Sequence, residues 1–427
     1  MNILILGSGG RENAFAWKIS KSNKCDKLFI APGNAGTASY GINIPVSVTD
    51  FEGIFHLIEK ENIKMVIIGP EDPLVNGLRN FLIDEKGLDS VIIIGPGKEG
   101  AQLEGSKDFA KKFMLKHNIP TAKSKTFYPH QFEEGKKYLA AASTPIVLKA
   151  DGLAAGKGVV IDDTIEKAEK TLKSMLLDKK FGEASNKVVI EEYLEGIELS
   201  VFVLTDGKNY VILPEAKDYK RIGEGDTGPN TGGMGAVSPV GFAGKDFMAK
   251  VEERIIKPTI KGLRDDSIDY VGFIFIGLMK VQEDPFVIEY NVRMGDPETE
   301  AVFPRIKNDL VELFEFVHHQ ELNKVNIDID DRTATTVVLV SKGYPGDYEK
   351  GKKIEGLDNI KEALVFHAGT SFNENNNIIT NGGRVLAMTG LGKNIEEALR
   401  ISYKAAESVC YEGIQFRKDI GKDVINV

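Results

Sequence analysis

The sequence of 427 residues predicts a multidomain protein that combines the α/β and α+β fold classes. In the first hundred residues, short apolar runs alternate with helical patterns, which is typical of a parallel sheet covered on both faces. In the last hundred, strand patterns are followed by a helical one, which predicts a small α+β domain. At roughly 150 residues per domain, the length itself predicts about three domains.

The N-terminal region carries apolar runs that we predict as parallel strands, at Ile3–Leu6, Leu28–Ala31, Met65–Ile68 and Val91–Ile94. Helical patterns lie between them, at 11–20, 50–60 and 73–86. Each predicted strand ends in a loop that contains glycine or proline. Because ligands of such sheets bind outside the carboxyl ends of the strands, these loops predict a binding crevice.

From about residue 104 the chain predicts a longer succession of elements. Ser106 is a good N-cap for a helix that runs to His117. Further helices are predicted at 163–177 and 245–263. Strands are predicted at Ile146–Ala150, Lys187–Ile190, Glu198–Leu204, Asn209–Leu213, 271–281 and 286–290. We expect no strands in the polar, glycine-rich stretch 214–240, because structureless stretches of that length are usually functional or disordered.

The C-terminal region is the smallest predicted unit. Its strands are expected near Thr333–Val340, Leu364–Ala368 and Arg384–Met388, and its helix at 394–409. The three patterns together divide the chain into predicted domains at 1–103, 104–328 and 329–427.

Composition excludes several classes of protein. The 54 Lys and Arg residues against 63 Asp and Glu give a net charge of −9, which leaves no basic footprint for nucleic acid or an anionic membrane surface. No apolar run approaches the ~20 residues that span a bilayer, and no secretory signal pattern follows Met1. Cys25 and Cys410 form neither a disulfide framework nor a metal-binding spacing. We therefore expect a soluble, cytoplasmic protein.

The first glycine loop does not fit a dinucleotide-binding fingerprint. Glu12 stands where the third glycine should be after Gly7 and Gly9, and the second strand ends at Ala31-Pro32-Gly33 without an acidic residue for a ribose. A glycine turn that opens a helix remains, and its free N–H groups suit a phosphate. The alternative is a tight turn with a purely structural role.

A second glycine loop, 152–158, resembles a Walker A element but is one residue too short and lacks the Ser or Thr that holds Mg²⁺. Lys149 precedes this loop and Lys157 lies within it. Glycine amides beside two cations fit a flexible hairpin that closes over ATP phosphates. A plain β-turn with solvent-exposed lysines is the alternative.

Acidic residues follow the strand at 187–190. The backbone of Glu191-Glu192-Tyr193-Leu194 could contact an adenine edge, and Glu198 could bind ribose hydroxyls. A solvated strand end is the other interpretation of these carboxylates.

Three polar residues are spaced by two at the end of strand 286–290. On an extended chain Glu289, Asn291 and Arg293 point to one face. A carboxylate and an amide oxygen form a hard oxygen site for Mg²⁺, and an arginine can neutralise phosphoryl oxygens. A structural salt bridge between Glu289 and Arg293 is the alternative.

Ten segments together resemble one family, the phosphoribosylamine–glycine ligases (glycinamide ribonucleotide synthetases) of the ATP-grasp superfamily. They extend over nearly the whole chain in the family's order: GSGGREN (7–13), APGNAGT (31–37), IGPEDPLV (68–75), LEGSK (103–107), LKADGLAAGKGV (148–159), GPNTGGMGA (228–236), RMGDPETE (293–300), KGYPGDY (342–348), FHAGT (366–370) and NGGRVL (381–386). The chain departs from the family's usual residues at Asn13, Lys217, Tyr219, Met294 and Glu300.

The resemblance implies an ATP-dependent ligase of de novo purine (IMP) biosynthesis. It would join glycine to 5-phosphoribosylamine through a glycylphosphate, giving glycinamide ribonucleotide, ADP and phosphate. It also implies an N-terminal substrate-binding domain, a two-part ATP-grasp core with a mobile lid at about 125–188, and a C-terminal domain. We expect Mg²⁺ or Mn²⁺ as the metal and a monomer as the working form.

On this resemblance we assign roles to individual residues. The metal would lie on Glu289 and Asn291, and the catalytic residues would be Arg293, Asp296 and Lys149. ATP would be bound by Lys107, Lys149, Gly156, Lys157, Gly158, Glu191, Glu192, Tyr193, Leu194 and Glu198. The other two substrates would be bound by Gly9, Gly10, Arg11, Gly33, Asn34, Glu71, Asp218, Lys220 and Arg293. Asp218 and Asp296 are both candidates for glycine's ammonium group.

Three competing hypotheses stay open at this point. The chain could be another ATP-grasp carboxylate ligase or carboxylase of purine metabolism, or a biotin carboxylase. It could be a non-catalytic nucleotide sensor, or, least compatibly with the first loop, a dehydrogenase.

Overall fold

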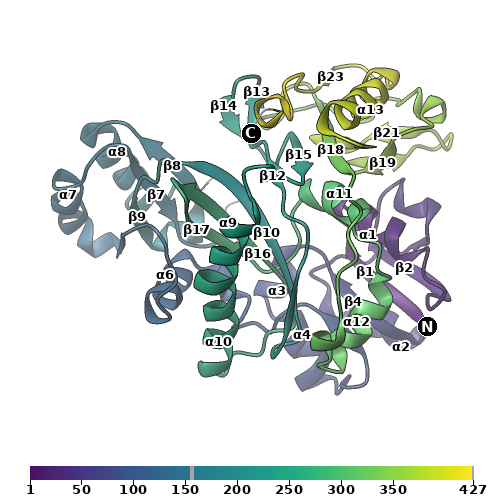
Figure 1. Cartoon of the computed structure of the whole chain (residues 1–427), viewed down its shortest axis with the longest axis horizontal. Coiled ribbons are helices and arrows are strands. Elements are labelled where there is room, and N and C mark those ends of the chain that lie inside the picture. Colours follow the sequence, from purple (N-terminus) through teal and green to yellow (C-terminus); the bar gives the residue numbers. More distant parts are fainter. Residues whose placement is uncertain (154–157, 426–427) are drawn as a thin grey trace.

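The computed structural model of the chain describes residues 1–153 and 158–425 (Figure 1). Gly156 and Lys157, which we expect to contact ATP, lie outside the described residues. An N-terminal parallel-sheet unit, a central antiparallel sheet with a projecting lid, and a C-terminal sheet-and-helix unit form the body, which confirms the predicted fold class. In the described part of the chain, no helix is both long and apolar enough to cross a membrane.

The N-terminal sheet is parallel with the order β3-β2-β1-β4-β5. Its strands are β1 (Asn2–Gly7), β2 (Lys27–Pro32), β3 (Ile42–Asn43), β4 (Ile63–Ile68) and β5 (Ile92–Ile94). Helices α1 (Gly10–Ile19) and α2 (Phe51–Lys60) agree with the predicted ones. Residues Ile3–Leu6 of the central strand are fully buried, as expected for a sheet covered on both faces.

The prediction of a single helix at 73–86 is wrong. The chain instead forms α3 (Glu71–Val75), α4 (Leu78–Asn80) and a π-helical turn, Phe81–Glu85. Gly77 separates the first two because its φ of 87° is left-handed, a conformation that a right-handed helix cannot contain. The short helix α5 (Gln102–Gly105) then leads into α6 (Lys107–Lys116), which Ser106 caps as predicted through its hydroxyl.

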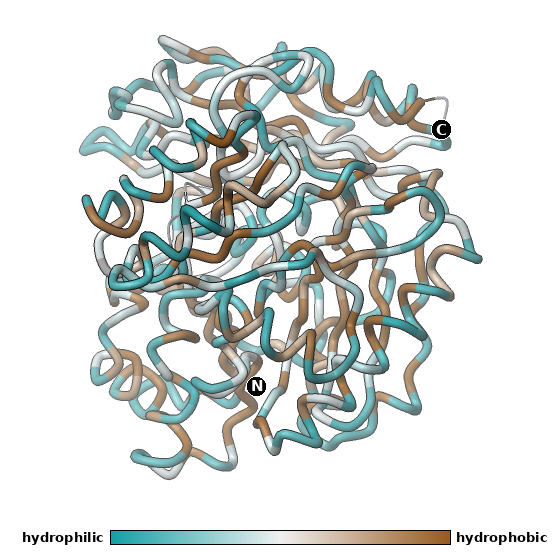
Figure 2. Tube along the Cα trace, turned by 90° about the vertical axis from the view of Figure 1, so that its left-hand side faces the viewer, coloured by the Kyte–Doolittle hydropathy of each residue, from teal (hydrophilic) through white to brown (hydrophobic). Residues whose placement is uncertain are grey.

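The central sheet is antiparallel with the order β11-β10-β16-β17. The predicted hairpin is confirmed as β10 (Ile197–Thr205) and β11 (Tyr210–Ile212), and β16 (Gly272–Val281) and β17 (Asp284–Asn291) form a second one. The predicted helix 245–263 consists of α9 (Lys245–Val251), a π-helical segment and α10 (Lys257–Asp265). Figure 2 shows hydrophobic segments gathered mainly in the interior of the trace and hydrophilic ones mainly along its outer edge.

The lid lies to one side of the body and has an apolar core of its own. Its sheet has the order β6-β9-β7-β8. The strands and helices of the lid are β6 (Ser124–Phe127), α7 (Phe132–Ala140), β7 (Ile146–Ala150), β8 (Val159–Asp162), α8 (Ile165–Leu176) and β9 (Val188–Glu192). The buried residues of this core include Phe127, Leu148 and Leu172.

The expectation that 214–240 contains no strands is wrong. The stretch forms β12 (Lys217–Asp218), β13 (Arg221–Gly223), β14 (Thr227–Asn230) and β15 (Gly235–Ser238). β15 pairs with β18 (Thr333–Ser341), about a hundred residues later in the chain. A glycine-rich strand is defined by its distant partner and not by a local apolar pattern, so the sequence alone conceals it.

The C-terminal sheet has the order β12-β15-β18-β22-β19, with β23 (Ile414–Gln415) beside β18. The remaining strands are β19 (Leu364–His367), β20 (Thr370–Phe372), β21 (Ile378–Thr380) and β22 (Arg384–Gly392). The predicted helix is α13 (Ile395–Ser408), which packs on β18 and β22. Helices α11 (Glu298–Val302) and α12 (Leu310–His318) connect the central sheet to this unit.

Candidate active site

A cavity of about 930 Å³ lies where the N-terminal loops, the lid and strand β17 meet. Thirteen of the predicted site residues among those described line it: Gly9, Arg11, Glu71, Lys107, Lys149, Gly158, Glu191, Asp218, Lys220, Glu289, Asn291, Arg293 and Asp296. These residues come from segments that are distant in the sequence. The fold therefore brings most of the predicted constellation to one place.

A second cavity of about 300 Å³ adjoins the first. Gly9, Asp296 and Arg384 line both cavities, whereas Gly33 and Asn34 line the second one. Of the described residues that line the second cavity, Arg384 is the one with a positive charge. Sequence reasoning assigned no role to Arg384, although it lies in the NGGRVL segment that carried the resemblance.

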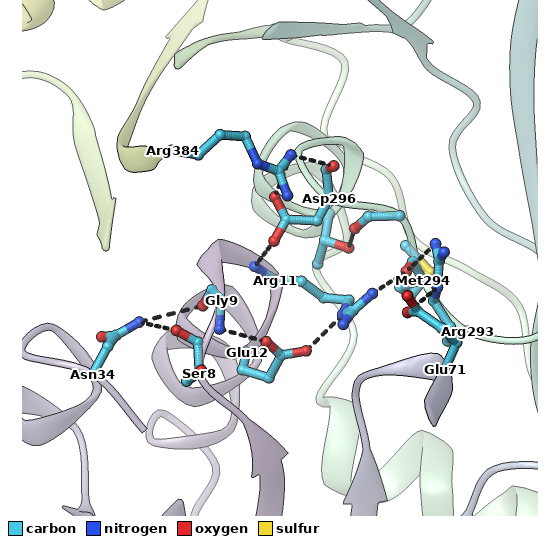
Figure 3. Close-up of polar contacts among 12 residues, drawn as sticks. Ser8, Gly9, Arg11, Glu12, Asn34, Glu71, Arg293, Met294, Asp296 and Arg384 are labelled. Atoms are coloured by element: carbon cyan, nitrogen blue, oxygen red, sulfur yellow. Dashed lines mark hydrogen bonds and ion pairs between the residues drawn. The ribbon is translucent and has the colours of Figure 1, made fainter. Parts of the chain in front are cut away.

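The start of α1 is already occupied by the protein's own carboxylates (Figure 3). The N–H of Gly9 donates to Glu12 Oε2 at 2.6 Å, and the N–H of Arg11 donates to Asp296 Oδ2 at 3.1 Å. The Arg11 side chain donates to Glu12 Oε1 at 2.6 Å and to the Met294 carbonyl at 3.1 Å. These helix-terminal N–H groups are thus satisfied without a bound phosphate.

Asp296 connects α1 to the C-terminal unit. Its carboxylate lies 3.1 Å from Arg384 Nη1, which also donates to the Asp296 carbonyl at 2.7 Å (Figure 3). Burial alone would raise the pKa of Asp296, but Arg384 and Arg11 outweigh it and hold the pKa below its usual value. Asp296 is therefore an ionised carboxylate with its partners in place.

Asn34 is used to shape its loop. Its side-chain amide donates to the carbonyls of Ser8 at 2.9 Å and His367 at 2.8 Å, and its Oδ1 accepts from the N–H groups of Gly36 and Thr37. Asn34 borders the second cavity, and because its polar atoms bind the protein itself, it contributes to that surface through the shape of its loop.

Arg293 makes its ion pairs with two carboxylates of the N-terminal side. Its Nη2 lies 2.6 Å from Glu104 Oε1, and its Nε lies 3.3 Å from Glu71 Oε2. Among the described residues no ion pair joins it to Glu289, so the structural salt bridge considered as an alternative is absent there. Arg293 Nη2 also donates to Asn291 Oδ1 at 3.2 Å, which holds the guanidinium beside the predicted metal ligands.

Glu289 and Asn291 fit a divalent cation. Both border the larger cavity, and Asn291 Oδ1, the atom that could bind a cation, accepts a hydrogen bond from Arg293 Nη2. Burial alone would raise the pKa of Glu289, but the charges of Lys220, Lys149 and Lys107 outweigh burial and hold the pKa below its usual value. The carboxylate is therefore ionised. An anionic oxygen and an amide oxygen are suitable ligands for Mg²⁺ or Mn²⁺, although the described residues contain no cluster of three acidic or imidazole ligands.

Two buried lysines share one carboxylate at the base of the lid. Glu191 Oε2 lies 3.1 Å from Lys149 Nζ and 3.2 Å from Lys111 Nζ. Burial lowers the pKa of Lys111 to about 8. Sequence reasoning missed Lys111, which lies on the buried face of α6 and gave no motif signal. Lys107 Nζ, one turn earlier, donates to the Gly152 carbonyl at 2.9 Å.

A cluster of acidic side chains surrounds Lys220. This lysine pairs with Glu198 and lies 4.0 Å from Glu289. Burial and the carboxylates of Glu198 and Glu289 raise the pKa of Asp218, and Lys220 opposes them only in part. Burial and Asp218 likewise raise the pKa of Glu298, a cavity residue that sequence reasoning missed within RMGDPETE.

The remaining predicted residues lie outside the lining of both cavities as the described residues form them. Gly10 lies on α1, where an added side chain would collide with Glu300, and Glu192 accepts a hydrogen bond from the Lys123 N–H at 2.8 Å. Tyr193 is 42% exposed and Leu194 is half-buried. Glu198 faces Lys220.

Two of the departures from the family's usual residues contact the C-terminal segment. Lys217 and Tyr219 both bind the carboxylate of Asp423, the latter through a hydroxyl that donates at 2.5 Å. Asn13 accepts the N–H of His367 at 2.9 Å. These side chains therefore hold the C-terminal unit against the rest of the molecule.

Three domain models of a single family match most of the chain. The phosphoribosylglycinamide synthetase N domain matches residues 1–104, its ATP-grasp (A) domain residues 105–299 and its C domain residues 334–423. The chain belongs to the phosphoribosylglycinamide synthetase family. The resemblance inferred from the ten segments is thereby confirmed, as are the ATP-grasp fold and the class of ligase.

Individual members of the family are similar over their full length. A phosphoribosylamine–glycine ligase of Yersinia pestis is 44% identical over 426 residues, which are 99% of this chain and 98% of that protein. One of Clostridium acetobutylicum is 44% identical over 422 residues, with 99% and 100% covered. The crystal structure of the phosphoribosylamine–glycine ligase of Thermotoga maritima matches with a TM-score of 0.86 and 37% identity, over 99% of this chain and 100% of its own.

Outside the family, the likeness is one of fold alone. The biotin carboxylase domain of the Hydrogenobacter thermophilus 2-oxoglutarate carboxylase, solved with MgADP, ADP and bicarbonate, matches with a TM-score of 0.73 at 16% identity, over 97% of this chain and 91% of that one.

Proposed function

We propose that this chain joins glycine to 5-phosphoribosylamine and hydrolyses ATP to ADP and phosphate, giving glycinamide ribonucleotide for de novo purine biosynthesis. The full-length similarity to phosphoribosylamine–glycine ligases carries this proposal. The convergence of Lys149, Glu289, Asn291 and Arg293 on one cavity supports it, because the reaction needs cations around a transferring phosphoryl group.

Glu289 and Asn291 would hold a divalent cation, Mg²⁺ or Mn²⁺, together with nucleotide phosphates and water. When bound, the ion supplies charge neutralisation for two anions that must approach each other. The ionised state of Glu289 and the place of both residues on the lining of the larger cavity support this assignment. Asn291 Oδ1, which accepts from Arg293 Nη2, would bind the ion in place of or beside the guanidinium.

ATP would extend from the lid to β17. Lys149 and Lys107 would bind its phosphates, helped by the loop residues Gly156, Lys157 and Gly158. The backbone of residues 191–194 would contact the adenine and Glu198 the ribose. Since Glu191 and Lys149 pair with each other, the triphosphate would compete with this carboxylate for the lysine.

Glycine would bind between Arg293 and the acidic cluster. Its ammonium group has two candidate partners, and Asp218 is the better one because Asp296 is already engaged by Arg384 and by the start of α1. Arg293 would orient the carboxylate that receives the phosphoryl group. Lys220 would help to keep Glu289 ionised while the substrate is absent.

Phosphoribosylamine would bind across the two cavities. Its phosphate would approach Arg384 and the Gly9, Gly33 and Asn34 loops, and its ribose Glu71. We place the phosphate beside Arg384 because this residue brings a full positive charge to the lining of the second cavity, although the phosphate would compete there with Asp296. The neutral amine would then attack the acyl carbon of glycylphosphate, with phosphate as leaving group.

A glycylphosphate is hydrolysed if water reaches it, so the lid is expected to close over the reacting groups. We expect the enzyme to work as a monomer in the cytoplasm; sedimentation at micromolar concentration tests the first of these two expectations.

The decisive experiment measures phosphate and ADP release with ATP, a divalent ion, glycine and freshly made phosphoribosylamine, each omitted in turn. We expect full release only when all are present. Release that needs formate or bicarbonate in place of glycine would assign the chain to another ATP-grasp reaction. No release under any combination would support a nucleotide sensor.

A further inference from the structure

Glu300 on α11 is a buried acid without a hydrogen-bond donor. Its exposed fraction is 0%, and neither carboxyl oxygen has a hydrogen-bond partner among the described residues. A buried carboxylate without hydrogen-bond donors is strongly disfavoured, because the water that it loses on burial is not replaced.

The carboxyl group of Glu300 lies beside that of Asp296 at the start of α1. A methyl group built on Gly10 would come within 2.1 Å of Glu300 Oε1 and 3.7 Å of Asp296 Oδ1. The absence of a side chain at Gly10 thus lets both acids reach the same point of the helix. Any larger residue there would displace Glu300.

Among the described residues, the positive charge beside these two acids is directed at Asp296. The Asp296 carboxylate pairs with the Arg384 guanidinium and accepts the Arg11 N–H, and Arg384 also donates to the carbonyls of Gly232 and Asp296. Burial first and the charge of Asp296 second raise the pKa of Glu300 well above its usual value. The charged or titratable groups on the elements around it are Asp296 and Glu298 on its own segment, Arg384 on β22, Arg11, Glu12 and Lys18 on α1, and Arg305 on the short turn after α11. Arg305 donates to Ser238 Oγ and the Arg332 carbonyl, and Lys18 donates to the Ile306 carbonyl. Strands β15 and β18, which also pack against α11, carry none in the described chain.

We propose that Glu300 is a positioning residue that stays protonated and donates its O–H to the Asp296 carboxylate. This bond holds Asp296 against both the start of α1 and Arg384. Its effect on catalysis rests on the proposed function, because Asp296 and Arg384 border both cavities. The protonated state itself does not depend on that function.

The protonated state has a thermodynamic consequence. A glutamate in the unfolded chain ionises near pH ~4.3, so folding at neutral pH takes up a proton at Glu300. The contribution of Glu300 to the free energy of unfolding is therefore complete below pH ~4.3 and is lost as the pH rises toward the pKa in the folded state. Glu300→Gln keeps the shape of the side chain and supplies an N–H donor to Asp296, but it removes the titratable carboxyl group.

Thermal unfolding from pH 5 to pH 9 tests the protonation. We expect the Tm of Glu300→Gln to exceed that of the unsubstituted chain by a margin that is smallest at pH 5 and grows with pH. Glu312→Gln, at an exposed glutamate of α12, should keep a constant margin. A constant margin for Glu300→Gln as well would overturn the protonated state, whether or not the chain has ligase activity.

Steady-state kinetics test the positioning role. Glu300→Ala should raise the KM for phosphoribosylamine by roughly tenfold and leave the KM for ATP nearly unchanged, whereas Glu300→Gln should restore the KM to within about twofold at pH 7.5. An unaltered KM for phosphoribosylamine in Glu300→Ala, or an equal loss in Glu300→Gln, would overturn the role. If Glu300→Ala does not fold, the pH-dependent comparison with Glu300→Gln still decides the protonation.

Discussion

Lys149 Nζ lies 3.1 Å from Glu191 Oε2, and both side chains are buried where the lid meets the rest of the cavity. The same carboxylate oxygen also accepts Lys111 at 3.2 Å, while Glu191 Oε1 has no hydrogen-bond partner among the described residues. One carboxylate thus holds two lysines, which leaves a net positive charge beside the place proposed for the phosphates of ATP. Without nucleotide, Glu191 keeps Lys149 in position.

Lys149→Ala removes the lysine that we place on the phosphates. We expect kcat/KM for ATP to fall by about a hundredfold or more, because the lost cation acts in a site of low dielectric. Initial rates at varied ATP measure this effect. Lys173→Ala, at an exposed lysine of α8, is the matched control and should behave as the unsubstituted enzyme. Unchanged KM and kcat in Lys149→Ala would refute the assignment.

Glu289→Ala tests the metal ligand. We expect ligation to fall by at least about a hundredfold, with the concentration of Mg²⁺ or Mn²⁺ needed for half-maximal rate increased, because one of two protein ligands is lost. Glu283→Ala, at an exposed glutamate of the same hairpin, controls for loss of negative charge. Full turnover at saturating metal in Glu289→Ala would exclude the site, provided that the melting curve is unchanged.

Asp218→Asn and Asp296→Asn separate the two candidates for glycine's ammonium group. The first should raise the KM for glycine by about tenfold or more, because a charge-assisted hydrogen bond is lost. The second should act mainly on the KM for phosphoribosylamine, since it releases Arg384. The reverse pattern would transfer the ammonium site to Asp296.

Arg384→Ala should raise the KM for phosphoribosylamine by roughly tenfold or more and leave the KM for ATP unchanged, because it removes the cation of the second cavity. Arg384→Lys should recover only part of the loss, since lysine lacks the planar guanidinium. Arg400→Ala, on the exposed side of α13, provides the control. Equal effects on both substrates would argue for a structural role of Arg384.

The burial of His367 should make the free energy of unfolding decrease in acid. The ring is 9% exposed and accepts or donates one hydrogen bond, to Thr370, and burial lowers its pKa to about 4. The unfolded chain takes up the proton near pH ~6.5, so stability is complete above that pH and falls by about 3 kcal/mol at most as pH decreases to about 4.

His367→Gln should therefore flatten the pH dependence of unfolding between pH 6.5 and 4, measured by urea denaturation. His56→Gln, at an exposed histidine, should not alter it. A slope that persists in His367→Gln would mean that other groups cause the acid transition.

Local patterns in the sequence predict most of the helices and strands of this protein. Apolar runs such as Ile3–Leu6 identify the parallel sheet, and the spacing of Glu289, Asn291 and Arg293 indicates the shared face that all three present to the larger cavity. The ten ordered segments also identified the family, because glycine loops and polar strand ends keep their order along the chain. These signals depend on neighbours within a few residues.

The partners of those residues were decided only by the tertiary structure. Arg293 pairs with Glu71 and Glu104, Glu191 joins Lys111 to Lys149, and Glu300 meets Asp296 at Gly10. The strand β15 became visible only through β18. Which charge is neutralised, and which acid keeps its proton, depends on burial and on groups brought together across hundreds of residues, and neither quantity can be read from local spacing.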